Sequence, residues 1–219
     1  MSHPAHMEKS KPAGDRMVLP GTLRMVAWEV TRSCNLACVH CRASSVHGPY
    51  EGELDTGRCL RLIDEIAAFS RPVIILTGGE PLLRPDIFEI AAYGDAKGLR
   101  MVMATNGTLV DDAMARRIRE AGIRRVSISL DGIDAARHDA FRQVPGAFEG
   151  ALAGIEALKR AGVEFQVNTT VTRMNLDQVG DLLALAQKLG AAAHHVFLLV
   201  PTGRGKEMAH QAISAEEYE

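Results

Sequence analysis

The chain has 219 residues, which is enough for one domain with a sizeable hydrophobic core, or for a domain with a tail. Hydrophobic residues make up 47% and charged residues 24%, proportions typical of a globular chain and not of a disordered one. The 25 Lys and Arg nearly balance the 27 Asp and Glu, so the chain lacks the excess positive charge that a non-specific nucleic-acid binder needs.

The first 20 residues are polar and contain Pro4, Pro12 and Pro20, with no apolar core of a secretion signal. The longest apolar runs, such as residues 196–200, are too short to cross a bilayer. We therefore expect a flexible N-terminal tail over residues 1–20, no membrane partner and a cytoplasmic location. In a reducing compartment, the four cysteines are expected to be metal ligands or core thiols before they are disulfides.

Strand-like and helix-like segments alternate along the rest of the chain. The apolar patterns predict strands over residues 23–30, 73–76, 100–104, 124–130, 163–171 and 194–200, and helices over 56–69, 86–97, 111–121, 135–141, 148–161 and 175–189. This alternation predicts an α/β fold of βαβ units around a parallel sheet. Periodicity alone leaves open a doubly wound sheet and a partial barrel.

In either architecture, the chemistry is expected at the carboxyl ends of the strands. Polar and small residues gather after each predicted strand: Cys34, Gly78-Gly79-Glu80, Thr105-Asn106-Gly107, Ser129 and Asp131, Asn168, and Pro201-Thr202-Gly203. The sequence therefore predicts an active site on this rim.

Cys34, Cys38 and Cys41 form a C-x3-C-x2-C motif in the loop after the first predicted strand. Three thiolates so close together can converge on one soft metal centre. A structural zinc ion would need a fourth ligand, and His40 is badly placed for that role between two of the cysteines. A [4Fe–4S] cluster normally takes four thiolates, so three leave one iron open to a chelating small molecule. Three core cysteines and a zinc site remain the alternatives.

This motif resembles the signature of the radical S-adenosylmethionine (SAM) superfamily, and Gly78-Gly79-Glu80-Pro81 is similar to the second motif of that superfamily. The resemblance covers about residues 23–203. It implies a partial (β/α)6 barrel of parallel strands with outer helices, as a core domain over residues 21–205. It also implies a [4Fe–4S] cluster on the three cysteines, which donates an electron to SAM and releases a 5′-deoxyadenosyl radical that abstracts hydrogen from a substrate.

The resemblance also implies which residues contact SAM. These are His40, Gly78, Gly79, Glu80, Pro81, Thr105, Ser129, Asp131 and Asn168. The glycines let the backbone approach the cofactor closely, and Glu80 adds an acceptor. His40 is expected to pack against the adenine without binding metal. Simple polar strand ends remain an alternative for Ser129, Asp131 and Asn168, with Asp131 capping the next helix.

Arg204 and Lys206 follow the last strand on the same rim, so they are candidates to anchor a carboxylate-bearing substrate, with solvated loop charges as the alternative. Arg142 is a further candidate for a cofactor carboxylate. His138 is expected on a helix surface or linked to Arg142. Cys59 lies at helical spacing with apolar residues and is expected to be a core residue.

The segments 28–34, 40–44 and 197–205 resemble the tetrapyrrole-modifying branch of the superfamily, and within it the alternative haem synthases most closely. This implies that two propionates of iron-coproporphyrin III are decarboxylated oxidatively to vinyl groups, giving haem b, with electrons from a flavodoxin or ferredoxin. Didecarboxysiroheme deacetylation, haem d1 synthesis and maturation of a ribosomal peptide remain alternatives. A non-enzymatic Fe–S or zinc-binding module is the alternative of another class.

Relatives with an extended C-terminal domain bind auxiliary clusters through further cysteines, but this chain has none after Cys59. Ser214-Ala215-Glu216-Glu217 is typical of a capping box that opens a helix. We therefore expect residues 206–219 to be the start of a truncated C-terminal extension.

Overall fold

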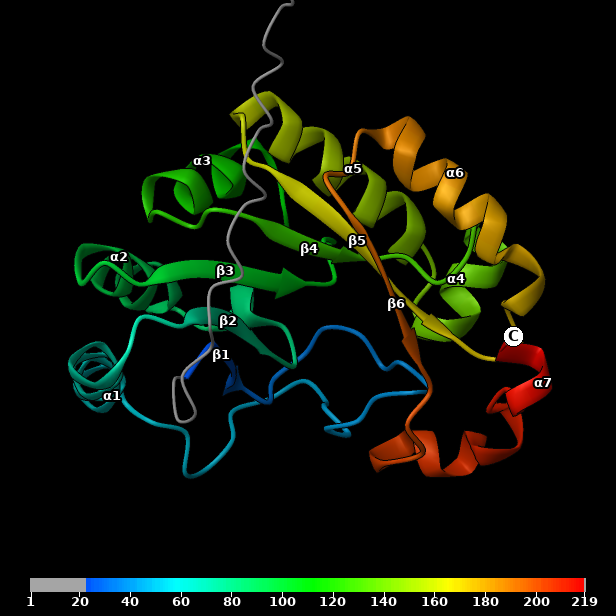
Figure 1. The fold of residues 1–219 in the computed structure, drawn as a ribbon, viewed down its shortest axis with the longest axis horizontal. Coiled ribbons are helices and arrows are strands. Elements are labelled where there is room, and N and C mark those ends of the chain that lie inside the picture. Colours follow the sequence, from blue (N-terminus) through cyan, green and yellow to red (C-terminus); the bar gives the residue numbers. More distant parts are fainter. Residues whose placement is uncertain (1–22, 219) are drawn as a thin grey trace, which may run out of the picture.

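The computed structural model describes residues 23–218, so the tail predicted over residues 1–20 lies outside the described residues. Six strands form one sheet: β1 (Met25–Thr31), β2 (Val73–Gly78), β3 (Arg100–Thr105), β4 (Val126–Ser129), β5 (Phe165–Val171) and β6 (His194–Leu198). All neighbouring strands are parallel, and their order in the sheet is their order in the chain (Figure 1).

Helices fill the connections between the strands and follow the last one. They are α1 (Thr56–Phe69), α2 (Ile87–Ala96), α3 (Asp112–Glu120), α4 (Ala135–Arg142), α5 (Ala147–Ala161), α6 (Val179–Leu189) and α7 (Ala215–Tyr218), with short 3-10 segments η1 (Pro81–Leu83), η2 (Leu176–Gln178) and η3 (Gly203–Gln211). None of the helices within residues 23–218 is long and apolar enough to cross a membrane.

The strand order decides between the two predicted architectures. A doubly wound sheet reverses its order at a switch point, and the six described strands show no reversal. Right-handed crossovers that all run the same way put the helices on one face and curve the sheet into part of a barrel. Figure 1 shows α2, α3, α5 and α6 on the outer side of the sheet and the loop after β1 on the other side. The predicted partial (β/α)6 barrel is confirmed.

The hydrophobic core lies between the sheet and these outer helices. Alternate residues of the strands are fully buried, and pairs such as Ile74 and Met101 lie opposite each other on neighbouring strands. Ile63 of α1 and Ile118 of α3 pack into the same core. Each such side chain stabilises the fold by about 1.5–3 kcal/mol when fully buried. Cys59 is fully buried in this core, as predicted.

The helix ends follow from local sequence. Asp134 caps α4 by accepting a hydrogen bond from the Arg137 N–H at 2.8 Å, so Asp131 is not the cap of this helix. Gly162 and Gly190 end α5 and α6 in the left-handed conformation, as their positions predict.

The predicted capping box before α7 is confirmed. The Ser214 N–H donates to the Glu217 carboxylate at 2.7 Å, and the Glu217 N–H donates to the Ser214 hydroxyl at 3.2 Å. The differences from prediction lie at other boundaries. The helix predicted over residues 175–189 begins as η2 and becomes α6 only at Val179, and β6 ends at Leu198. η3 runs continuously across residues 205 and 206, so the domain boundary predicted there stays a prediction.

Two helical glycines give a stability test of the packing between the sheet and its helices. A Cβ at Gly154 of α5 would lie 2.4 Å from the carbonyl oxygen of Gly107, in the turn after β3. Gly154→Ala is expected to destabilise the fold by about 1–3 kcal/mol, because helix and turn must separate. Gly180 of α6 has open space at its Cβ, so Gly180→Ala is expected to stabilise by about 0.4–1 kcal/mol. Urea unfolding of both variants measures the difference, and equal effects would contradict it.

Candidate active site

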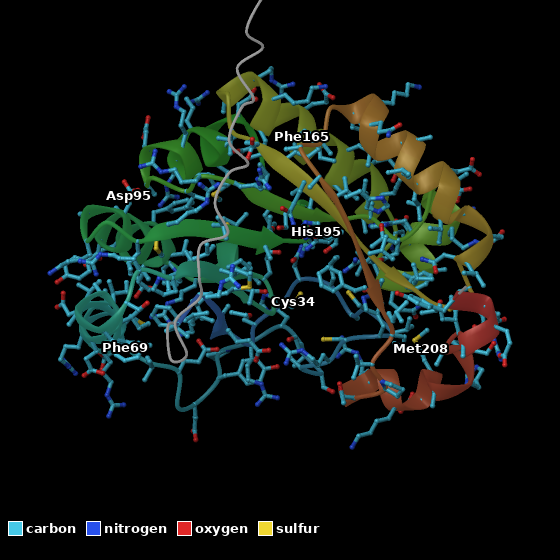
Figure 2. All side chains as sticks on the ribbon, viewed as in Figure 1. Cys34, Phe69, Asp95, Phe165, His195 and Met208 are labelled. Atoms are coloured by element: carbon cyan, nitrogen blue, oxygen red, sulfur yellow. The ribbon has the colours of Figure 1, made fainter. Side chains whose placement is uncertain are left out.

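A cavity of about 330 Å³ opens at the carboxyl ends of the strands, between the sheet and the loop after β1. The three cysteines of the motif line it, together with strand-end residues from β2 to β6: Thr77, Gly78, Gly79, Ala104, Thr105, Asn106, Ser129, Thr170, Phe197 and Leu198. Figure 2 labels Cys34 in the loop that follows β1. The predicted clustering of unusual residues on one rim is therefore present in the fold.

The cysteine loop, residues 34–46, is held by its backbone. The Cys34 N–H donates to the Val46 carbonyl at 3.1 Å and closes the loop. The N–H groups of Ala37 and Val39 donate to the carbonyls of Arg142 and Phe141, at 3.2 and 2.9 Å. These carbonyls lie in the last turn of α4, where they have no partner within the helix. The end of α4 thus fixes the segment that carries the cysteines.

Each of the three sulfurs faces a hydrogen-bond donor. The Leu36 N–H lies 3.4 Å from Cys34 Sγ, the Ser45 N–H 3.3 Å from Cys41 Sγ, and Arg142 Nη1 3.5 Å from Cys38 Sγ. Such donors stabilise sulfur in its charged form. Burial nevertheless raises the pKa of the Cys34 thiol to about 11, so the free thiol is neutral. A metal centre there must displace that proton when it binds.

The set of donors around the cavity bears on whether a cluster or a single metal ion suits it. Among residues 23–218, no three His, Cys, Asp or Glu side chains come close enough together to hold one ion. A [4Fe–4S] cluster bonds each thiolate to a different iron. The three soft donors around one cavity fit a cluster better than the zinc alternative.

Buried polar atoms without a hydrogen-bond partner gather at this same cavity. In the described part of the chain there are five: His40 Nδ1, Ser45 Oγ, Arg142 Nε, Arg204 Nη2 and Thr202 Oγ1. The first four belong to residues that line the cavity. An unpaired buried polar atom costs about 1–3 kcal/mol, so a cluster of them marks a site built for a polar group.

The two glycines of the second motif join the end of β2 to the end of β1 and to the residues just before the cysteine loop. A Cβ at Gly78, whose φ is +136°, would lie 2.2 Å from the Thr31 carbonyl oxygen, and one at Gly79 would lie 2.3 Å from that of Ser33. The Gly79 N–H donates to the Thr31 carbonyl at 2.8 Å. The absence of side chains at Gly78 and Gly79 therefore lets this turn pack against the backbone of Thr31 and Ser33, in addition to the approach to a cofactor that was predicted. Both glycines also line the cavity.

Glu80 lies outside the cavity lining and is fully buried. Its carboxylate accepts hydrogen bonds from the Thr105 hydroxyl at 2.7 Å, the Asn106 N–H at 2.8 Å and the Leu82 N–H at 3.1 Å. Burial raises the pKa of Glu80, and these hydrogen bonds oppose that rise. The side chain therefore ties the end of β2 to the end of β3, while Pro81 begins η1 beneath it.

Asp131 is also fully buried and lies behind the cavity wall. One carboxylate oxygen accepts the Thr170 N–H at 2.8 Å, and the other forms an ion pair with Arg142. Burial alone would raise the pKa of Asp131, but the Arg142 guanidinium holds it below its usual value. Asp131 thus supports Arg142, which itself lines the cavity and contacts Cys38.

His138 belongs to the same buried group, so the expected surface position is wrong, and its link to Arg142 runs through Asp131. Its Nδ1 accepts the Asp131 N–H at 3.1 Å, and Asp131 pairs with Arg142. Burial lowers the pKa of His138 to about 4, which keeps the ring neutral at pH 7.

The structure brings most of the predicted site residues to the cavity. Its lining includes Cys34, Cys38, Cys41, His40, Gly78, Gly79, Thr105, Ser129 and Arg204. Glu80, Pro81, Asp131, Asn168 and Lys206 are outside it. The Asn168 amide oxygen accepts a hydrogen bond from Gln166 at 3.0 Å, and Lys206 is exposed.

Sequence reasoning missed Thr170 as a lining residue. It lies two residues beyond Asn168 on β5, and side chains two apart share one face of a strand. Counting two residues on from Asn168 in the fifth predicted strand could therefore have found Thr170 as well.

The model of the radical SAM superfamily matches residues 28–186, well over half of the chain. The chain belongs to the radical SAM superfamily. Two relatives are called AdoMet-dependent heme synthase. The one from Oleidesulfovibrio alaskensis is 52% identical over 99% of this chain and 58% of its own length. The one from Methanosarcina barkeri is 52% identical over 90% of this chain and 56% of its own length. The chain thus spans a little over half of these relatives.

The fold is shared with distant members of known structure. Streptococcus suis SuiB bound to S-adenosylmethionine superposes with a TM-score of 0.70 at 14% identity, over 88% of this chain and 43% of SuiB. This likeness supports the radical SAM fold.

Replacing a motif cysteine and replacing Cys59 are expected to have different effects on the iron content of the protein. After anaerobic reconstitution, replacing Cys34, Cys38 or Cys41 by Ala is expected to abolish bound iron and sulfide, because a cluster on these three thiolates would lose one of its protein ligands. Cys59→Ala, on the buried face of α1, should retain both. Metal and sulfide analysis measures the outcome. Zinc in place of iron in the anaerobically purified protein would count against the cluster.

The buried His138 predicts a loss of stability in acid. The unfolded chain takes up a proton at this residue near its ordinary pKa of 6.5, but the folded chain does so only near 4. Stability contributed above pH 6.5 is therefore lost as the pH falls toward 4, by about 2 kcal/mol between pH 7 and pH 5. His138→Asn, which can still accept the Asp131 N–H, should show a smaller decrease. Urea unfolding at both pH values tests this, with the exposed His210→Asn expected to behave like the wild type.

Proposed function

We propose that this chain holds a [4Fe–4S] cluster on Cys34, Cys38 and Cys41, binds SAM beside it, and decarboxylates propionate side chains of iron-coproporphyrin III to give haem b. The observation that carries the proposal is the cavity that joins three thiols to four residues with unpartnered buried polar atoms. The relatives from O. alaskensis and M. barkeri are called heme synthases, which supports haem as the product. When bound, the cluster supplies the electron that cleaves SAM to methionine and a 5′-deoxyadenosyl radical.

Two guanidinium groups are suited to the carboxylate of SAM. Arg142 Nε and Arg204 Nη2 are buried donors without a partner on the cavity lining, and both groups carry positive charge. A carboxylate bound there gains charge-assisted hydrogen bonds. The amino group of SAM can donate to carbonyl oxygens of the Gly78-Gly79 turn, whose backbone lines the same cavity.

His40 and the strand ends are suited to the nucleoside part of SAM. Burial lowers the pKa of His40 to about 4, so its ring is neutral, and it packs edge-on against Phe141 with ring centroids 5.6 Å apart. A neutral ring can pack against adenine without repelling a cationic sulfonium. Ser129 offers a hydroxyl group for the ribose. The Thr105 hydroxyl already donates to Glu80, and Asn168 on β5 stays a candidate.

The surface beside the cavity suits a large apolar substrate. Phe197, Leu198 and Val200 line the cavity and are exposed by 50%, 45% and 61%. An apolar surface of this kind with polar groups close by is typical of ligand sites. We place the flat tetrapyrrole against these side chains, with one propionate directed into the cavity.

The reaction balances if each propionate loses one hydrogen atom, carbon dioxide and one electron. The hydrogen atom leaves the carbon beside the one that carries the carboxylate and converts the radical to 5′-deoxyadenosine. Carbon dioxide and the electron then leave, and the carbon–carbon double bond of the vinyl group forms. A one-electron acceptor takes that electron, and a flavodoxin or ferredoxin in the cytoplasm supplies the electron for SAM cleavage.

The proposal predicts a two-step decarboxylation. Anaerobically reconstituted protein with SAM, dithionite and iron-coproporphyrin III should form 5′-deoxyadenosine and porphyrins that lack one and then two carboxyl groups, read by mass spectrometry. Cys38→Ala should form neither, because the cluster is missing.

The matched substrate control is the methyl ester of the same porphyrin, which cannot release carbon dioxide and should stay unconverted. 5′-Deoxyadenosine without any decarboxylated porphyrin would overturn the substrate while leaving the radical SAM chemistry in place.

A further inference from the structure

The turn after β6, residues 202–205, folds back onto the cysteine loop. Arg204 makes three hydrogen bonds there: its Nε donates to the Cys38 carbonyl at 2.8 Å, its Nη1 to the Ser45 carbonyl at 2.7 Å, and its backbone N–H to the Cys41 carbonyl at 3.0 Å. Arg204 follows Cys38 by 166 positions in the sequence and Ser45 by 159 positions. One residue of the C-terminal part thus contacts the backbone of two motif cysteines.

Gly203 allows this contact. Its φ is +55°, and a Cβ there would lie 2.2 Å from the Arg42 carbonyl oxygen and 2.5 Å from that of Cys41. Any side chain at this position would push the turn away from the cysteine loop. The turn and the loop are therefore fitted to each other along their backbones.

The guanidinium group suits this position for a geometric reason. Its donors are fixed in one plane, so Arg204 holds the Cys38 and Ser45 carbonyls at a set separation. A lysine ammonium carries the same charge but has no fixed fork. With two of its nitrogens engaged, Arg204 has only the buried Nη2 left for the cavity. In the structure Arg204 holds the cysteine loop, and its role as a substrate anchor stays a prediction.

Arg204 also adds charge next to Cys38. Arg142 Nη1 lies 3.5 Å from Cys38 Sγ on the side-chain end, and Arg204 Nε lies 2.8 Å from the backbone oxygen of the same residue. Positive charge close to a cluster favours its reduced, more negative state. Loss of that charge should lower the reduction potential.

We propose that Arg204 is a positioning residue for the cluster. By holding the carbonyls of Cys38, Cys41 and Ser45, it fixes where two of the three thiolates lie and so controls how firmly the cluster is retained and at what potential it is reduced. This inference rests on the cluster assigned in the proposed function.

The experiment compares the full chain with Arg204→Ala and Arg204→Lys, with Arg116→Ala on the exposed face of α3 as the matched control. All four are reconstituted anaerobically, without SAM or porphyrin. The measurements are iron and sulfide per chain, the rate of iron loss to a chelator, and the midpoint potential followed by electron paramagnetic resonance.

We expect both Arg204 variants to lose iron about tenfold to a hundredfold faster, the factor that one charge-assisted hydrogen bond is worth. Arg204→Ala should also shift the midpoint potential to more negative values, and Arg204→Lys should shift it less because the charge remains. Arg116→Ala should match the wild type in all three measurements.

Wild-type iron retention and potential in Arg204→Ala would overturn the inference. So would an intact cluster in Arg204→Ala combined with weaker porphyrin binding in a separate absorbance titration, which would make Arg204 a substrate cation. A wild-type chain that binds no cluster would instead overturn the proposed function.

If circular dichroism shows that Arg204→Ala does not fold, Arg204→Lys and Gly203→Ala decide. Gly203→Ala keeps the guanidinium and displaces the turn, so faster iron loss in both would support the inference. Wild-type retention in both would overturn it.

Discussion

The buried ion pair between Asp131 and Arg142 is the interaction on which the site depends. A guanidinium group inside a protein is costly unless a charge and hydrogen bonds compensate it, and removing one partner of such a pair costs about 3–5 kcal/mol. Asp131 is itself fixed by the Thr170 N–H, and its backbone N–H by His138. The pair therefore joins β4, β5 and α4 at one point beneath the cysteine loop. From there Arg142 supports that loop twice, through its carbonyl to Ala37 and through its side chain to Cys38.

The ion pair and the hydrogen bonds around it explain how the site can keep buried polar atoms that have no hydrogen-bond partner. Four of the five buried atoms without a partner in the described chain belong to residues of one cavity. Each costs about 1–3 kcal/mol, a sizeable part of the stability of a single domain. The buried core between the sheet and the outer helices offsets that cost. The positions of the unpaired atoms are held by neighbours that do have partners, so a bound polar group meets donors that are already oriented.

The parts of the fold that depend on nearby residues could be predicted from the sequence. Apolar periodicity located the strands and helices, and the capping box at Ser214 and Glu217 was found because its partners are three residues apart. The rim position of the cysteines followed from the parallel sheet. What the sequence could not supply was the use of each polar side chain. Asp131 is expected with Ser129 at the end of the fourth predicted strand, but nothing local shows that its carboxylate is already bonded to Arg142 and Thr170.

Glu80 and Arg204 illustrate the same limit. A carboxylate in a glycine turn and an arginine on the rim both suggest ligand contacts by residue type. In the structure Glu80 bonds to Thr105 and Asn106 on the next strand, and Arg204 bonds to a loop more than a hundred residues earlier. Such long-range bonds depend on the curvature of the sheet, which brings the ends of distant strands together. No pattern within either segment encodes them.

That curvature leaves a gap, because β1 and β6 are the two edges of the sheet and do not pair with each other among the six described strands. The cysteine loop follows β1, and the turn that carries Arg204 follows β6. The bonds from Arg204 to Cys38 and Ser45 therefore bridge the two edges at the carboxyl end of the open barrel. An open barrel admits a substrate too large for a closed one, but it loses the strand pairing that would fix the edges. In this protein side-chain and backbone hydrogen bonds between the two edge segments replace that pairing at the place where the cysteines must be held.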